Sequence, residues 1–138
     1  MQLKSIILIK ERISNFANYS NNYFIFVLLI CSTMKIEFED IALEELYTNG
    51  STNSGQYRKL PKDVVKQYIK VVNYIKAVRR LEDLFYIKSL HYEKKKGDLK
   101  GVDAVWINKQ YRLFFYSSSN EEGIVVNALL FEISKHYE

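Results

Sequence analysis

The chain has 138 residues, of which 48% are hydrophobic and 14% aromatic, which suits one packed domain and excludes a disordered protein. Its net charge of +4 is too small to indicate nucleic-acid binding by itself. The single cysteine, Cys31, excludes an internal disulfide, and no Cys/His spacing fits a zinc site, so we expect a cytoplasmic protein without metal or cofactor.

The first 33 residues contain an apolar run of nine residues, from Tyr23 to Cys31. A bilayer needs about 20 apolar residues to be crossed, so this run predicts no membrane span. Basic residues precede the run, which leaves a targeting segment as an alternative. We favour a fold of residues 34–138 that starts at Met34, where the strand pattern begins, with residues 1–33 as an upstream extension outside it.

The next part of the chain predicts one strand followed by helices. Lys35–Phe38 alternates polar and apolar residues, as a short strand does. Asp40 predicts the cap of a helix that stops at Asn49-Gly50, and Pro61 predicts the start of a second helix. Apolar residues at helical spacing mark the buried face of that second helix: Val64, Tyr68, Val71, Val72, Ile75 and Val78. Residues 81–85 predict a further short helix.

The last part of the chain predicts strands joined by short turns. Asp103–Ile107 and Gln110–Tyr116 are rich in aromatic and β-branched residues, and Asn108-Lys109 predicts a hairpin turn between them. Five of their aromatic and apolar residues are of the kind that a sheet buries, and we assign most of these five to the core: Trp106, Tyr111, Leu113, Phe114 and Phe115. After a polar turn, Ile124–Ile133 predicts a central strand. The expected fold is α+β, with the N-terminal strand and the helices packed on one face of a curved antiparallel sheet.

Charge is distributed unevenly along the chain. Residues 57–80 contain eight Lys or Arg against one Asp, whereas residues 34–49 contain one Lys against five acids. This asymmetry favours an anionic partner on the basic side. A lysine face that only keeps an amphipathic helix soluble explains the same pattern.

Candidate chemistry gathers around His91, one of two histidines. Histidine is the side chain whose ordinary pKa is nearest neutrality, and four lysines follow His91 within nine residues: Lys94, Lys95, Lys96 and Lys100. Arg112 projects from a predicted strand, and His136 lies beyond the last one. A proton-transfer group beside positive charge suits an anionic substrate, although an isolated histidine is more often structural.

The order of these motifs resembles the HigB branch of the RelE-like toxins. The resemblance is carried by Leu90-His91, by Lys96-Gly97-Asp98 with Gly101, by Gln110–Phe115 and by the final segment Glu132–Tyr137. It implies a RelE-like fold and a type II toxin that cleaves messenger RNA on the ribosome. It also implies a helix-turn-helix antitoxin, HigA-like, as the neutralising partner. Two residues are inserted after His91, and Ser134 stands where the family often has Asp.

The resemblance also implies roles for individual residues. RNA supplies its own nucleophile, the 2′-hydroxyl, so cleavage needs a base, an acid and positive charge at the phosphate, without a metal. His91 and His136 would exchange protons in an order that the sequence leaves open, while Arg112 and Lys96 would stabilise charge. Lys94, Lys95, Lys100 and Tyr137 would bind RNA. The alternatives are a related toxin that acts by binding a protein, and a degenerate toxin that only binds its antitoxin.

Overall fold

The structure is a computed structural model in which residues 34–136 are described. The predictions about residues 1–33 and about Tyr137 therefore lie outside the described residues. Within the described range, no helix combines the length and apolar character that crossing a membrane requires.

Five strands form one sheet in the order β1-β5-β4-β3-β2. Their bounds are β1 Lys35–Phe38, β2 Glu93–Lys94, β3 Val102–Trp106, β4 Tyr111–Ser119 and β5 Val125–Lys135. The α+β class is confirmed, but the sheet is mixed, because β1 runs parallel to β5 while the other neighbours are antiparallel. No short turn joins β1 to β5, so hairpin geometry does not fix their relative direction. The sequence did not predict β2, because two residues are too few to show a period.

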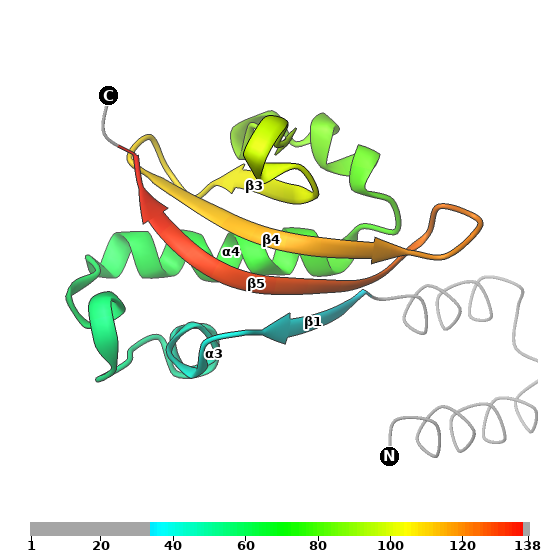
Figure 1. The fold of residues 1–138 in the computed structure, drawn as a ribbon. Coiled ribbons are helices and arrows are strands. Elements are labelled where there is room, and N and C mark those ends of the chain that lie inside the picture. Colours follow the sequence, from blue (N-terminus) through cyan, green and yellow to red (C-terminus); the bar gives the residue numbers. More distant parts are fainter. Residues whose placement is uncertain (1–33, 137–138) are drawn as a thin grey trace, which may run out of the picture. The chain divides into compact units, whose positions relative to one another are not determined.

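Two α-helices connect β1 to the rest of the sheet (Figure 1), α3 Ile41–Asn49 and α4 Lys62–Ala77. Both predicted caps of α3 are confirmed: the Asp40 carboxylate accepts a hydrogen bond from the Ala42 N–H at 2.8 Å, and Gly50 adopts the left-handed conformation. Helix α4 begins directly after Pro61, as predicted. Four 3-10 turns complete the helical structure: Gly55–Lys59, Leu81–Tyr86, Lys88–Leu90 and Gly97–Leu99.

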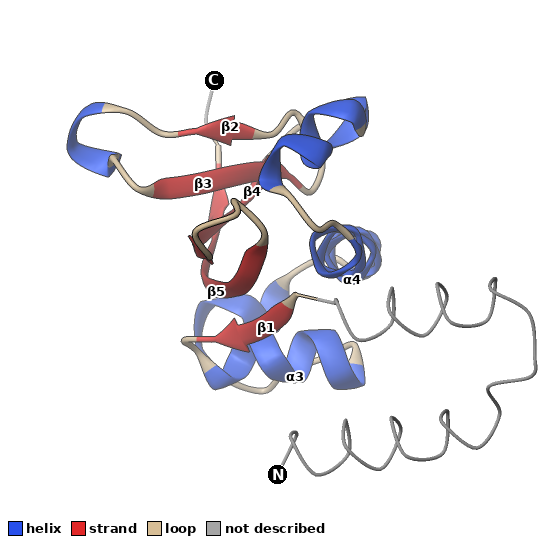
Figure 2. Cartoon of the chain, turned by 90° about the vertical axis from the view of Figure 1, so that its right-hand side faces the viewer, coloured by secondary structure: helices blue, strands red, loops and turns tan. Residues whose placement is uncertain are grey.

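Within residues 34–136, the sheet has one face covered by helix α4 and one face that is left open. Figure 2 shows α4 on one side of the curved strands β4 and β5. The core lies between this helix and the sheet and contains five of the six predicted helix residues together with alternate strand residues: Val64, Tyr68, Val71, Val72, Ile75, Val105, Leu113, Phe115, Leu130 and Ile133. Val78, the sixth, follows α4 and is half-buried against the core. Because side chains alternate along a strand, Trp106, Arg112 and Phe114 point to the opposite, open face.

The hairpin between β3 and β4 is one residue longer than predicted. The Asn108 side-chain oxygen accepts hydrogen bonds from the N–H groups of Gln110 and Tyr111, both at 2.8 Å, and so widens the turn. As a result Trp106 pairs with Arg112, whereas a two-residue turn at Asn108-Lys109 would have paired it with Tyr111. The observed register puts the tryptophan and the arginine side by side on the open face.

A buried tyrosine joins the two helices. The Tyr68 side chain of α4 is fully buried, and its hydroxyl donates a hydrogen bond of 2.9 Å to the Leu43 carbonyl of α3. Burial is the main reason why the pKa of Tyr68 is raised above its ordinary value. A group whose folded-state pKa is raised stabilises the fold below its unfolded pKa, and this contribution is lost as the pH rises further.

Replacing Tyr68 with Phe should therefore lower the free energy of unfolding by about 1 to 3 kcal/mol at neutral pH, because the Leu43 carbonyl loses its buried donor. The loss of stability above about pH 10, where an unfolded tyrosine ionises, should also become shallower in Y68F. Urea unfolding between pH 7 and 11 measures both effects. Y86F is the matched control, since Tyr86 is 83% exposed. Equal stability of Y68F and Y86F would contradict the role given to this hydrogen bond.

Candidate active site

His91 ends the 3-10 turn Lys88–Leu90 in the left-handed conformation, with φ 42° and ψ 46°. Among the described residues it is the one non-glycine residue with positive φ. Such a conformation costs on the order of 1 kcal/mol or more for a side chain other than glycine, so the surrounding structure must hold it. His91 is an exposed residue. Its ring stacks on the Trp106 ring, with 3.9 Å between the ring centroids and 30° between the ring planes.

Trp106 also contacts Arg112, its cross-strand neighbour. The guanidinium carbon lies 3.8 Å from the centroid of the indole ring, well within the range of a cation–π contact. Arg112 Nη1 donates hydrogen bonds to the carbonyls of Asn108 at 2.8 Å and Lys109 at 3.1 Å. Arg112 is only 9% exposed, so its positive charge is fixed in place by the turn and by the tryptophan. The prediction that Arg112 projects from a rigid element agrees with this geometry, although the side chain is more buried than expected.

His136 lies at the same end of the sheet. Its N–H donates a hydrogen bond of 2.6 Å to the Gln110 carbonyl, which continues the β4–β5 ladder past Lys135. Ser134 pairs with Arg112, so Trp106, Arg112 and Ser134 form one row across three strands. Strands β3 and β5 flank β4, which separates their backbones by about 10 Å. His91 contacts this row through Trp106 of β3, whereas the backbone of His136 follows β5 on the other side of β4.

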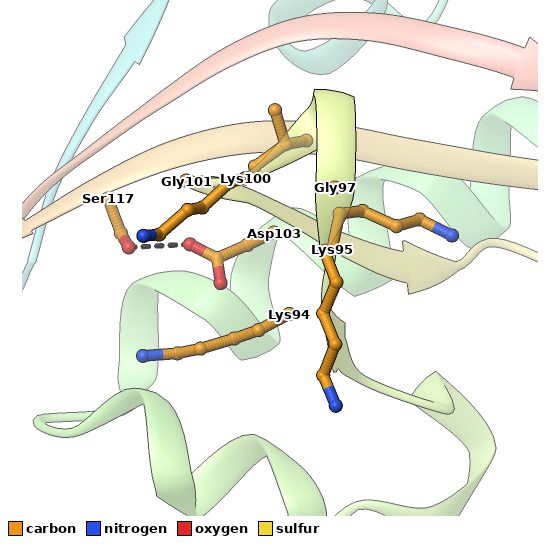
Figure 3. Close-up of a pocket in the computed structure, with 9 residues that line it drawn as sticks. Lys94, Lys95, Gly97, Lys100, Gly101, Asp103 and Ser117 are labelled. Atoms are coloured by element: carbon orange, nitrogen blue, oxygen red, sulfur yellow. Dashed lines mark hydrogen bonds between the residues drawn. The ribbon is translucent and has the colours of Figure 1, made fainter.

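The lysines gather at the other end of β3. A hollow of about 470 Å³ is lined by Lys94, Lys95, Lys96, Gly97, Lys100, Gly101, Val102, Asp103 and Ser117. In Figure 3 Lys94 and Lys100 extend to the same side as the Asp103–Ser117 pair, whereas Lys95 points away from them. Val102 and Trp106 are about 13 Å apart along the strand at 3.3 Å per residue. Lys96 thus belongs to this hollow and is placed with the other three lysines, at the end of β3 opposite Trp106.

Asp103 is a buried carboxylate that the sequence did not single out. It is 3% exposed and accepts hydrogen bonds from the hydroxyls of Tyr92 at 2.8 Å and Ser117 at 2.6 Å. Burial, followed by the hydrogen bond to Asp103, raises the pKa of Tyr92 above its ordinary value. These bonds tie the segment after His91 to β3 and β4, so Asp103 supports the position of the lysine-rich loop.

Trp106 lies in a different environment from the core, which sequence analysis expected for most of the aromatic and apolar residues of the hairpin. It is half-buried on the open face and contacts both His91 and Arg112. Phe114 is half-buried on the same face. The correct hairpin register would have been enough to find the pair of Trp106 and Arg112. Within residues 34–136, no group of three or more His, Cys, Asp or Glu side chains is arranged to hold a metal ion.

The chain is similar to known toxins. Residues 36–131 match the family model described as the RelE-like toxin of type II toxin-antitoxin system HigB. Toxin HigB-1 from Vibrio cholerae serotype O1 is 28% identical over 97 residues, which cover 70% of this chain and 95% of that protein. A YoeB/ParE toxin from Agrobacterium tumefaciens has a similar solved structure, with 14% identity, a TM-score of 0.47, and coverage of 75% of this chain and 100% of that one.

The family match contains His91, the four lysines, Trp106 and Arg112, and it ends before Ser134 and His136. It covers the sheet except for Lys35, the first residue of β1, and the last part of β5. The chain therefore belongs to the HigB family of RelE-like toxins of type II toxin-antitoxin systems.

Proposed function

We propose that this toxin is an endoribonuclease that cleaves messenger RNA, on the ribosome in the cytoplasm, without a metal ion. The observation that carries the proposal is the contact of Trp106 with both the His91 ring and the Arg112 guanidinium on the open face. It places a side chain able to transfer protons near neutral pH beside a fixed positive charge. Those are two of the requirements for attack by a 2′-hydroxyl on the adjacent phosphate.

The chemistry assigns one role to each group. One histidine of the pair His91 and His136 takes the 2′-hydroxyl proton, and the other donates a proton to the leaving 5′-oxygen. Arg112 stabilises the negative charge that develops on the phosphate. Ser134 cannot hold His136 by charge, so we assign the larger share of catalysis to His91. Lys96 and the other lysines of the hollow lie at the end of β3 opposite Trp106. They would hold RNA phosphates at a distance from the cleaved bond.

As a member of a toxin-antitoxin family, the chain has an antitoxin partner. We propose that a HigA-like, helix-turn-helix antitoxin covers part of the basic surface. Helix α4 supplies four exposed lysines to that surface: Lys62, Lys66, Lys70 and Lys76. An acidic partner surface would be attracted to this helix over a distance set by the ionic strength.

Removing the His91 ring should abolish most RNA cleavage and growth inhibition, by about 100- to 10,000-fold, which is the usual contribution of general acid–base catalysis. His91→Asn is the informative variant, because asparagine tolerates the left-handed backbone at this position better than alanine does. Primer extension on messenger RNA after brief expression measures cleavage. Ser89→Ala, an exposed change in the same 3-10 turn, is the control and should cleave normally. Cleavage at the wild-type rate by folded H91N would falsify the proposal.

Arg112→Lys should separate charge from geometry. Lysine keeps the positive charge but lacks the planar group that stacks on Trp106 and bonds to the turn carbonyls. We expect cleavage to fall by about 100-fold or more, the usual cost of losing one stabilising donor, with a measurable loss of thermal stability. Arg80→Lys is the matched control, since Arg80 also bonds to a carbonyl, that of Glu122 at 3.3 Å, but on the surface. Equal cleavage by R112K and R80K would argue against a role for the planar guanidinium of Arg112.

Association with the antitoxin should slow as salt is added, because exposed charges are screened beyond about 8 to 10 Å at physiological ionic strength. Dissociation should change less. Stopped-flow measurements between 50 and about 500 mM salt separate the two rates. Lys66→Gln on α4 should lower the association rate more than Lys35→Gln on β1, which makes the same charge change at the acidic end of the chain. An association rate that does not change with the salt concentration would contradict the proposed electrostatic attraction between the antitoxin and the basic surface.

A further inference from the structure

The open face carries three aromatic side chains beside the row of Trp106 and Arg112. Phe114 and Tyr116 of β4 both stack with Phe131 of β5, with centroid distances of 6.3 Å and 4.7 Å. Phe114 and Phe131 are half-buried, and Tyr116 is 46% exposed. We call these three residues the aromatic strip. It faces away from the core, so packing of the hydrophobic core does not explain it.

A β-bulge creates the strip. Phe114 pairs with Glu132, but the next residue, Phe115, pairs with Leu130, so Phe131 has no partner on β4. Without the bulge, alternation would place Phe131 on the covered face and Leu130 on the open face. With it, Leu130 is fully buried and Phe131 stacks on Tyr116. Bulges re-aim side chains in this way, often next to active sites.

The strip lies next to the candidate catalytic row. Phe114 is two residues from Arg112 on the same strand and face, which is about 7 Å, and Tyr116 is about 13 Å away. A charged residue stands on each side of Phe114. The Lys95 ammonium lies 5.8 Å from the Phe114 ring, on the β2 side, and Glu132 is the cross-strand partner of Phe114 on the β5 side.

We propose that the aromatic strip is a base-stacking subsite for the one or two nucleotides adjacent to the cleaved phosphate. This inference rests on the proposed ribonuclease function and names how that site holds its substrate. Aromatic faces accept any unstacked base of a single strand. On one side of the strip the Lys95 ammonium is ion-paired with Glu93, and on the other side lies Glu132. The strip thus orients the strand so that its next phosphate reaches His91 and Arg112.

Binding of a labelled 2′-O-methyl RNA oligonucleotide, measured by fluorescence anisotropy, tests this independently of cleavage, since that probe has no free 2′-hydroxyl. Tyr116→Ala should weaken binding by about 5- to 150-fold, which is the usual effect of removing one stacking ring. Tyr116→Phe should bind close to wild type, because it keeps the ring. Tyr86→Ala, which removes another highly exposed tyrosine from the Leu81–Tyr86 turn, should also bind normally.

An abasic oligonucleotide of the same length provides the second readout. It has phosphates but nothing to stack, so wild type and Y116A should bind it equally. Phe131→Leu repeats the test at the bulge and guards against a folding defect in Y116A. Equal affinity of wild type, Y116A and F131L for the 2′-O-methyl oligonucleotide would overturn the inference, as would variants that lose binding of the antitoxin and keep binding of RNA. Weakened oligonucleotide binding in Y116A together with unchanged cleavage in H91N would support the subsite while contradicting the proposed catalytic role.

Discussion

The pairing of β4 with β5 determines where nearly every important side chain lies. These two strands are paired along most of their length, and side chains alternate between the two faces of the sheet. Leu113 and Phe115 therefore enter the core under α4, while Arg112 and Phe114 face the opposite way. A shift of the pairing by one residue would exchange the two sets and bury the arginine in place of the leucine. Stability and chemistry thus depend on the same register.

Neutral groups contribute to holding the site. Two carbonyls of the hairpin turn and one indole ring position Arg112, and the same ring supports His91. The carbonyls and the aromatic face orient the guanidinium without adding a formal charge of their own. Asp103, the one buried carboxylate among residues 34–136, lies at the other end of β3 and accepts hydrogen bonds from the hydroxyl groups of Tyr92 and Ser117.

Local signals in the sequence predicted the helices well. Asp40, Gly50 and Pro61 act through their own backbone and side-chain chemistry, so they mark the ends of α3 and α4 wherever they occur. The apolar spacing of α4 likewise predicted its buried face. The family resemblance, read from the order of motifs between Leu90 and Phe115, is confirmed by the family match.

Features that depend on pairing could not be read from one segment alone. The turn at Asn108 was predicted one residue too short, because an Asn side chain that accepts two N–H groups widens it. The bulge at Phe131 depends on which residues of β4 lie opposite, and nothing in residues 124–133 alone marks it. The left-handed backbone of His91 is imposed by its surroundings, since the sequence offers no glycine there. The expectation of a core position does not hold for Trp106 and Phe114, because the face that they occupy also depends on the strand pairing.

The strand order has a consequence for how the toxin is made. Strand β5 is the last strand in sequence, yet it lies between β1 and β4, and Lys35 is paired with Asn127. During synthesis, β1 and α3 are therefore made long before β5, the strand that completes their contacts. The row of Trp106, Arg112 and Ser134, the bulge and the aromatic strip all include residues of β5, so they form together, once β5 is available to pair. The open face is thus structured only after nearly all of the described chain has been made.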